Sequence, residues 1–324
     1  MERTNLKRDI RSVCLTVTAF VASITILSSF IMVIIIFIQV LTNDMFMQIL
    51  LQSDDAFNTL MSNRPFQLMM SATMQDWIGV VSCLSIILGS LWFFLMRGKR
   101  FVTTDVTKKT AKAQPLMLLQ IFVLIGGVQL VMILINMMLQ TILAQSDVSM
   151  TDTLESSTSS ILATPAGWIY IILIAPVVEE TVFRGAVMRK LERYGANFAI
   201  ITSSLLFGLY HVILFQAIFA FAVGLLFAYV AGRYSLKWAM LLHGLNNLIA
   251  CLSALSATAS TAILIFYIAC LIASIVLLIA RRGVFRTQKQ AGAPAFPGVF
   301  KVAYSSPWLI AFMAVFVVYG FLIL

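Results

Sequence analysis

Apolar runs of helical length recur along the whole chain and are separated by short polar segments. A membrane-spanning helix needs roughly 20 such residues, because the bilayer interior leaves every backbone polar group to be satisfied within the protein. The pattern predicts spans at Val13–Leu41, Ile78–Met96, Leu116–Ala144, Ile161–Phe183, Phe198–Phe215, Gln216–Ala231, Leu236–Leu255, Thr261–Ala280 and Pro307–Leu324. We therefore expect an all-α, polytopic transmembrane helix bundle with about eight or nine membrane helices.

The two spans between Phe198 and Ala231 leave little room for a turn, which must fall near His211. A helix from Asn197 to His211 rises only about 21 Å, whereas the hydrocarbon core is about 30 Å thick. Short elements of this kind are tolerated where they line a cavity. We expect a hairpin here that does not fully cross the bilayer.

Basic residues lie at alternate ends of the predicted spans, and by the positive-inside rule these ends face the cytoplasm. They are Arg3, Lys7, Arg8, Arg11, Arg97, Lys99, Arg100, Lys108, Lys109, Lys112, Arg184, Arg189, Lys190, Arg193, Arg233, Lys237, Arg281, Arg282, Arg286, Lys289 and Lys301. The other ends carry Asp44, Asp54, Asp55, Asp76, Asp147, Asp152 and Glu155, with only Arg64 against them. The predicted topology has the amino terminus inside and the carboxyl terminus outside.

Composition supports the same picture. Hydrophobic residues make up 61% of the chain, charged residues 11%, and the mean hydropathy is +0.99, which excludes an ordinary soluble domain. The net charge of +9 does not point to nucleic acid, because the basic residues alternate with apolar spans and form no continuous patch. We expect a multi-pass protein of the cell membrane whose surroundings are membrane lipid.

A small set of ionisable residues interrupts the apolar pattern. Glu179 and Glu180 close one apolar run, and Arg184 follows one helical turn later. An acidic side chain at mid-bilayer costs about 2.5–3.5 kcal/mol, so such residues pair, line a cavity or carry chemistry. The chain's two histidines, His211 and His243, also lie in apolar segments. One polar site buried in the bundle would explain all of them.

Helical spacing distinguishes the two glutamates. Residues four apart share a helix face, so Glu180 can reach Arg184, whereas Glu179 is turned by about 100° from its neighbour. We expect Glu180 and Arg184 to compensate each other's charge and Glu179 to carry the chemistry. A carboxylate held away from water beside imidazoles can act as a general base near neutral pH. The same spacing places His243 and Asn247 on one face.

Small residues and one proline are expected to shape this site. Gly208, Gly224 and Gly244 lie in the same apolar segments and can permit close helix contact. Pro176 precedes the glutamates by about one turn and is expected to kink or loosen their helix.

Three short motifs follow one another: Glu179-Glu180-Thr-Val-Phe-Arg184 (EExxxR), Phe207-Gly-Leu-Tyr-His211 (FxxxH) and His243-Gly-Leu-Asn-Asn247 (HxxxN). Together they resemble the CPBP family of intramembrane endopeptidases, the CAAX proteases and bacteriocin-processing proteins, which includes the eukaryotic type II CAAX prenyl endopeptidases. The resemblance covers roughly Ile161–Leu255. It divides the chain into N-terminal membrane helices with outer loops (1–160), a CPBP-like catalytic core (161–255), and C-terminal membrane helices with a cytoplasmic linker (256–324). The polar outer loops are predicted at about Thr42–Trp77 and Gln145–Ser160, and the linker at Val284–Ser306.

This resemblance implies an endopeptidase that hydrolyses a peptide bond in a hydrophobic, lipidated or leader-peptide substrate. It implies that Glu179 and His211 activate a water, and that His243 and Asn247 stabilise the resulting oxyanion. Glu180 belongs to the same catalytic set. One oxyanion-hole donor is worth about 2.7–4 kcal/mol in acyl transfer. The implied mechanism needs no cofactor.

A zinc site is the alternative, because Glu179, His211 and His243 offer the three nitrogen and oxygen ligands typical of catalytic zinc, with water as the fourth. The HExxH signature is absent from the sequence. The resemblance favours the metal-independent glutamate mechanism, so we expect no metal.

Two functions of other classes are compatible with the same residues. A transporter or proton relay could use the intramembrane carboxylates, but such proteins typically have related halves, and we find no internal repeat. A non-catalytic family member could serve in bacteriocin immunity or as a membrane scaffold. Loss of motif residues would be its usual sign, whereas every motif position is filled here.

Overall fold

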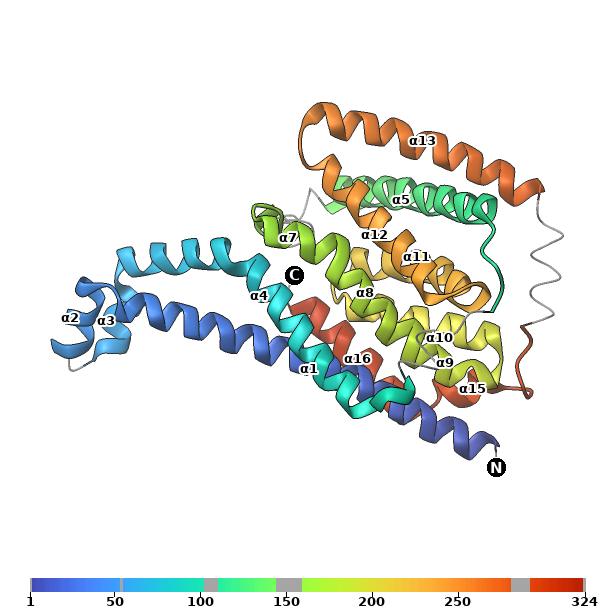
Figure 1. The fold of residues 1–324 in the computed structure, drawn as a ribbon, viewed down its shortest axis with the longest axis horizontal. Coiled ribbons are helices and arrows are strands. Elements are labelled where there is room, and N and C mark those ends of the chain that lie inside the picture. Colours follow the sequence, from blue (N-terminus) through green and yellow to red (C-terminus); the bar gives the residue numbers. More distant parts are fainter. Residues whose placement is uncertain (1, 53–54, 102–109, 144–158, 281–291, 323–324) are drawn as a thin grey trace.

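The computed structural model describes residues 2–52, 55–101, 110–143, 159–280 and 292–322, and within these ranges every regular element is helical (Figure 1). Six helices in this part of the chain are long and apolar enough to cross a membrane. They are α1 (Glu2–Leu41), α4 (Arg64–Arg100), α5 (Pro115–Leu143), the continuous helix that begins with α7 (Pro165–Ile169) and ends with η4 (Glu192–Tyr194), α11 (Leu214–Arg233) and α13 (Ala257–Ala280). The protein is a multi-pass, all-α membrane protein.

Three shorter helices occupy the remaining predicted spans. They are α10 (Ala196–Tyr210), α12 (Leu236–Ser253) and α16 (Pro307–Leu322). The two apolar ones, α10 and α16, are too short to meet the length expected of a full span. Each of the nine predicted spans therefore overlaps a helix. A helical hairpin is present around His211, but only its first arm, α10, is short, because α11 is long and apolar enough to cross a membrane.

The continuous helix from α7 to η4 runs through the middle of the molecule (Figure 1). On one side it contacts α4, which pairs along its length with α1. On the other side it contacts α12, and its last turns contact α10, which pairs with α11. The α5–α13 pair lies outside α11 and α12. Glu179 and Glu180 therefore lie on the central helix, which has other helices packed against it on several sides.

The predicted outer loop from Thr42 to Trp77 is largely helical. It contains α2 (Asp44–Gln52), α3 (Ala56–Ser62) and the first turns of α4. Asp55 caps α3 by accepting a hydrogen bond from the backbone N–H of Asn58 at 3.4 Å. A small apolar cluster holds these helices together, namely Val40, Phe46, Leu60 and Phe66. The predicted loop Gln145–Ser160 lies almost entirely outside the described residues.

The predicted linker Val284–Ser306 lies only partly within the described residues, and that part packs against the bundle. The N–H of Asn197 donates to the carbonyl of Gly292, and the N–H of Ala295 donates to the carbonyl of Tyr194. The short helix α15 (Val299–Tyr304) then contacts α1. The described part of the linker therefore packs against both α1 and the start of α10.

A buried carboxylate ties the amino-terminal helix to the end of the central helix. Asp9 on α1 is 4% exposed and accepts a hydrogen bond from the hydroxyl of Tyr194 at 2.8 Å. Arg193 forms an ion pair with the same carboxylate, and the Nζ of Lys190 lies 4.0 Å from it. The basic end of the central helix therefore lies beside the basic start of α1, as the predicted topology requires.

Asp9→Ala is expected to lower the free energy of unfolding by about 1–3 kcal/mol, because it removes a buried acceptor with charged partners and leaves the Tyr194 hydroxyl unpaired. The measurement is denaturant unfolding in detergent micelles. The matched control is Asp76→Ala, which removes an exposed aspartate from α4. Equal stability of the two variants would show that Asp9 does not anchor α1.

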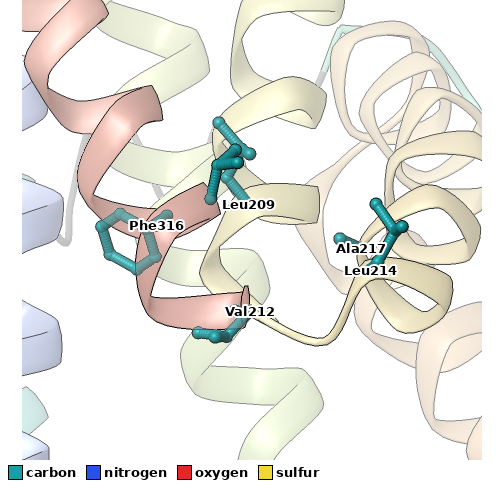
Figure 2. A pocket seen from close by; sticks show the side chains of 7 residues that line it. Leu209, Val212, Leu214, Ala217 and Phe316 are labelled. Atoms are coloured by element: carbon teal, nitrogen blue, oxygen red, sulfur yellow. The ribbon is translucent and has the colours of Figure 1, made fainter. Parts of the chain in front are cut away.

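The hairpin between α10 and α11 turns at residues 211–213, next to His211 as expected and ahead of the predicted span boundary between Phe215 and Gln216. Val212 has a φ of 64°, and the N–H of Ile213 donates to the carbonyl of His211 at 2.6 Å. An i to i+2 bond around a β-branched residue with positive φ is rare, and such a residue costs about 1–3 kcal/mol of backbone strain. Val212 of this turn and Leu209 before it line a small pocket together with Phe316 of α16 (Figure 2).

Candidate active site

The two glutamates lie on a short α-helical piece between two π-helical ones. η2 (Tyr170–Ile174) precedes α8 (Ala175–Glu180), and η3 (Thr181–Met188) follows it. The N–H of Ala175 donates to the carbonyl of Tyr170, five residues back. π-helical turns are rare, and they are frequent at functional sites because they turn side chains away from the regular helical positions.

Pro176 explains how this helix meets its neighbour α12. In the π-helical pattern the carbonyl of Ile171 would next bond to the N–H of residue 176, and proline has none. The side-chain Nδ2 of Asn247 donates to that carbonyl instead, at 2.9 Å. Gly244 permits the close approach, because a Cβ there would lie 2.7 Å from the carbonyl oxygen of Ile172. The close helix contact expected at Gly244 is confirmed. Pro176 lies just after the π-helical η2, and a kink there stays a prediction.

Asn247→Ala is expected to lower the free energy of unfolding by about 1–3 kcal/mol, because it leaves the Ile171 carbonyl without its side-chain donor. Adding Pro176→Ala supplies a backbone N–H at the missing position and is expected to restore most of that loss. The measurement is a double-mutant cycle of unfolding free energies, with Pro176→Ala alone as the control. Additive effects of the two substitutions would contradict the coupling.

A chain of charged and polar groups runs through the site. The Nη1 of Arg184 lies 3.1 Å from Oε1 of Glu180, and both side chains are fully buried. The same Oε1 lies 3.1 Å from Nδ1 of His243, whose other ring nitrogen lies 3.8 Å from Oε2 of Glu179. Glu179 is 6% exposed. His243 therefore stands between the two glutamates, and the expected pairing of Glu180 with Arg184 is confirmed.

Aromatic rings and a backbone carbonyl enclose the guanidinium of Arg184. Its Cζ lies 4.2 Å from the ring centroid of Phe207 and 5.8 Å from that of Phe227. Its Nη2 donates to the carbonyl of Gly224 at 3.1 Å, and a Cβ at Gly224 would lie only 3.1 Å from the same nitrogen. A desolvated cation gains from ring faces and from charge-assisted hydrogen bonds. The close contact expected at Gly224 is therefore one with Arg184.

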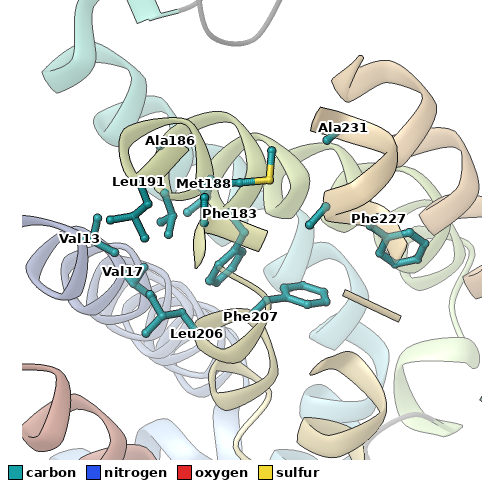
Figure 3. Close-up of a cluster of buried hydrophobic side chains, with 14 of the residues drawn as sticks. Val13, Val17, Phe183, Ala186, Met188, Leu191, Leu206, Phe207, Phe227 and Ala231 are labelled. Carbon is teal, nitrogen blue, oxygen red and sulfur yellow. The ribbon is translucent and has the colours of Figure 1, made fainter. Parts of the chain in front are cut away.

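Phe207 connects the three sequence motifs. Its ring lies under Arg184 of the first motif, and its centroid is 4.8 Å from that of His211 and 5.8 Å from that of His243. Both imidazoles meet it nearly edge-on. Figure 3 shows Phe183, Phe207 and Phe227 in the buried cluster at this point. The structure thus brings the motifs together around one apolar ring.

The hydrogen bonds of the histidines indicate which nitrogens are available. Nδ1 of His211 lies 2.9 Å from the carbonyl oxygen of Phe207 and must donate to it, because a carbonyl can only accept. The neutral ring then keeps Nε2 as an acceptor. Nδ1 of His243 likewise lies within hydrogen-bond distance of Glu180, at 3.1 Å. The other ring nitrogen of His243, Nε2, is on the side of Glu179.

The zinc alternative required Glu179, His211 and His243 to converge. Among the residues that the structure describes, no three histidine, cysteine, aspartate or glutamate side chains are arranged to hold a metal ion. That the reaction needs no metal stays a prediction, which the chelator experiment described below tests.

Phe227 was missed by the sequence reasoning. Its ring stacks on His243 with centroids 4.8 Å apart and an interplanar angle of 17°. It lies in the apolar helix α11, where Phe residues are common and nothing in the sequence sets this one apart. The backbone carbonyl of Ile171, the partner of Asn247, carries no sequence signal either.

Comparison with known proteins assigns this region. Residues 161–249 match the family described as type II CAAX prenyl endopeptidase Rce1-like. The match covers a little over a quarter of the chain and contains all three motifs. No curated protein and no solved structure matched the chain.

Proposed function

Through residues 161–249 the chain belongs to the CPBP/CAAX protease family of intramembrane peptide hydrolases, and on that premise we propose a glutamate-dependent endopeptidase in which Glu179 activates the attacking water. The substrate is a hydrophobic or lipidated peptide that reaches the site within the membrane.

The different surroundings of the two glutamates are the observation that carries this proposal. Oε1 of Glu180 lies 3.1 Å from Nη1 of Arg184 and 3.1 Å from Nδ1 of His243, and its Oε2 is buried without a hydrogen-bond partner, so the charge of Glu180 is balanced inside a closed part of the bundle. Among the described residues, the basic group closest to Glu179 is Nε2 of His243, at 3.8 Å, which is longer than a hydrogen bond. Glu179 is therefore the carboxylate without a close cationic partner, and it is 6% exposed whereas Glu180 is 0% exposed.

The proposed reaction needs only water and the peptide. A carboxylate oxygen of Glu179 takes one proton from the water, while Nε2 of His211 accepts a hydrogen bond from the same water and orients it. The oxygen attacks the peptide carbonyl and forms a tetrahedral intermediate. Collapse of this intermediate breaks the C–N bond, and Glu179 returns the proton to the leaving amine. The products are a carboxylic acid and an amine.

The oxyanion of the intermediate is proposed to lie against Asn247 and His243. The amide of Asn247 has two N–H bonds, and the carbonyl of Ile171 uses one of them. The other can donate to the oxyanion. A donor role for Nε2 of His243 requires the doubly protonated ring, whose charge the two glutamates would balance. The Asn247→Ala/Pro176→Ala pair separates this role from the structural one: it is expected to recover stability but not cleavage.

The decisive experiment is cleavage of hydrophobic, lipidated and leader-peptide reporters by the purified protein in lipid. Wild type, Glu179→Ala and His211→Ala are compared with and without a chelator, and Glu192→Ala serves as a control on the same helix. Cleavage lost in both site variants but insensitive to the chelator is the expected result. Chelator sensitivity would favour zinc. No cleavage by wild type, with both variants still functional in cells, would favour an immunity or scaffold role.

A further inference from the structure

The last helix, α16, lies outside the matched residues 161–249 but reaches the turn that carries His211. Its buried face is formed by Leu309, Phe312, Phe316 and Gly320. At its start, the guanidinium of Arg11 on α1 lies 4.7 Å from the ring centroid of Trp308. The helix is therefore anchored at one end to α1 and contacts the α10–α11 hairpin toward its other end.

One close contact joins α16 to the turn. A Cβ added at Gly320 would lie 2.5 Å from the carbonyl oxygen of Val212, a separation that real side chains do not adopt. Beside this contact lies a small apolar pocket, lined by Leu209, Val212, Leu214, Ala217, Phe316, Val317 and Gly320 (Figure 2). Only the glycine lets α16 approach the backbone of the turn so closely.

The turn transmits its position to His211. Val212 holds a φ of 64°, which is unfavourable for a β-branched residue and persists only where the surroundings impose it. Backbone hydrogen bonds connect the residues on either side of Val212. The N–H of Ile213 donates to the carbonyl of His211 at 2.6 Å, and the N–H of His211 donates to the carbonyl of Gly208 at 3.0 Å. A shift of the Val212 carbonyl must therefore move the His211 backbone.

We infer that α16 is a positioning element for the site: Gly320 and Phe316 hold the Val212 turn in its strained conformation and thereby fix the imidazole of His211. Residues outside the family segment thus complete the site. The catalytic consequence rests on the proposed function, whereas the placement of the imidazole can be observed without any assay of activity.

The two histidines of the chain make the placement measurable, because selective histidine labelling gives one set of NMR signals for each ring. His211→Ala assigns them. In Gly320→Ala, whose methyl presses on the Val212 carbonyl, and in Phe316→Ala, which removes the ring behind the turn, the His211 signals are expected to shift or broaden while those of His243 stay in place. Phe316→Ala carries the test if Gly320→Ala does not fold.

Two controls match these variants. Gly232→Ala adds a methyl to a helical glycine whose nearest neighbour would be Met188 at 3.9 Å, and Val315→Ala trims an exposed side chain of α16. Neither is expected to move the His211 signals. Unchanged His211 signals in both test variants, or equal shifts of both histidines, would overturn the positioning role.

Reporter cleavage then tests the consequence separately. Misplacing a catalytic group by about 1 Å can cost about 100-fold in rate, so kcat is expected to fall by up to about that factor with KM little changed. A moved His211 signal with full kcat would leave the placement intact but remove His211 from the chemistry. That outcome would count against the proposed function alone.

Discussion

Glu179→Gln is expected to reduce peptide cleavage by about 10²- to 10⁴-fold while leaving the fold intact, because the amide cannot take a proton from water. The substitution keeps the size of the side chain. Within the described residues, Glu179 approaches a basic group no closer than the 3.8 Å to His243, so the free energy of unfolding is expected to change little. The measurement is kcat on a cleavable reporter, with denaturant unfolding as the check on the fold.

Glu180→Gln is the informative comparison, because it changes the neighbouring residue in the same way. It removes the charge that balances Arg184 at 3.1 Å in a fully buried pair, so its main effect is expected on stability. If Glu179→Gln kept full activity while Glu180→Gln abolished it without unfolding, the roles of the two glutamates would have to be exchanged.

Features that depend on local helical spacing could be predicted from the sequence. Glu180 can pair with Arg184 because residues four apart on a helix share one face. Phe207 and His211 have the same spacing and contact each other for the same reason. The positions of the spans follow from apolar length alone, because the bilayer sets the length of each helix. The helical content of the segment after Thr42 was missed, because its polar residues are also those that cap short helices.

Features that depend on which helices are neighbours could not be predicted. The place of His243 between Glu179 and Glu180 joins segments more than 60 residues apart, and one sequence contains no record of that contact. The stacking of Phe227 and the reach of α16 to Val212 are of the same kind. The absence of an N–H at Pro176 could be predicted from the sequence. The hydrogen bond from Asn247 to the carbonyl of Ile171 could not.

Arg184→Met is expected to lower the free energy of unfolding by about 3–5 kcal/mol. The guanidinium is 0% exposed, forms an ion pair with Glu180 through Nη1 and donates a hydrogen bond from Nη2 to the carbonyl of Gly224. Removing it leaves the Glu180 carboxylate buried without its cation, and an uncompensated buried charge is more costly than the pair itself. The measurement is denaturant unfolding in micelles, with Arg233→Met as an exposed control on α11.

The double variant Glu180→Leu/Arg184→Met distinguishes this explanation from a simple loss of packing. Replacing a buried ion pair by apolar side chains is often neutral for stability, so the second substitution is expected to recover most of the loss caused by the first. Cleavage is not expected to return, because Nδ1 of His243 then lacks the acceptor that orients its ring toward Glu179. A double variant less stable than Arg184→Met alone would mean that the site depends on the shape of Arg184 between Phe207 and Phe227 more than on its charge.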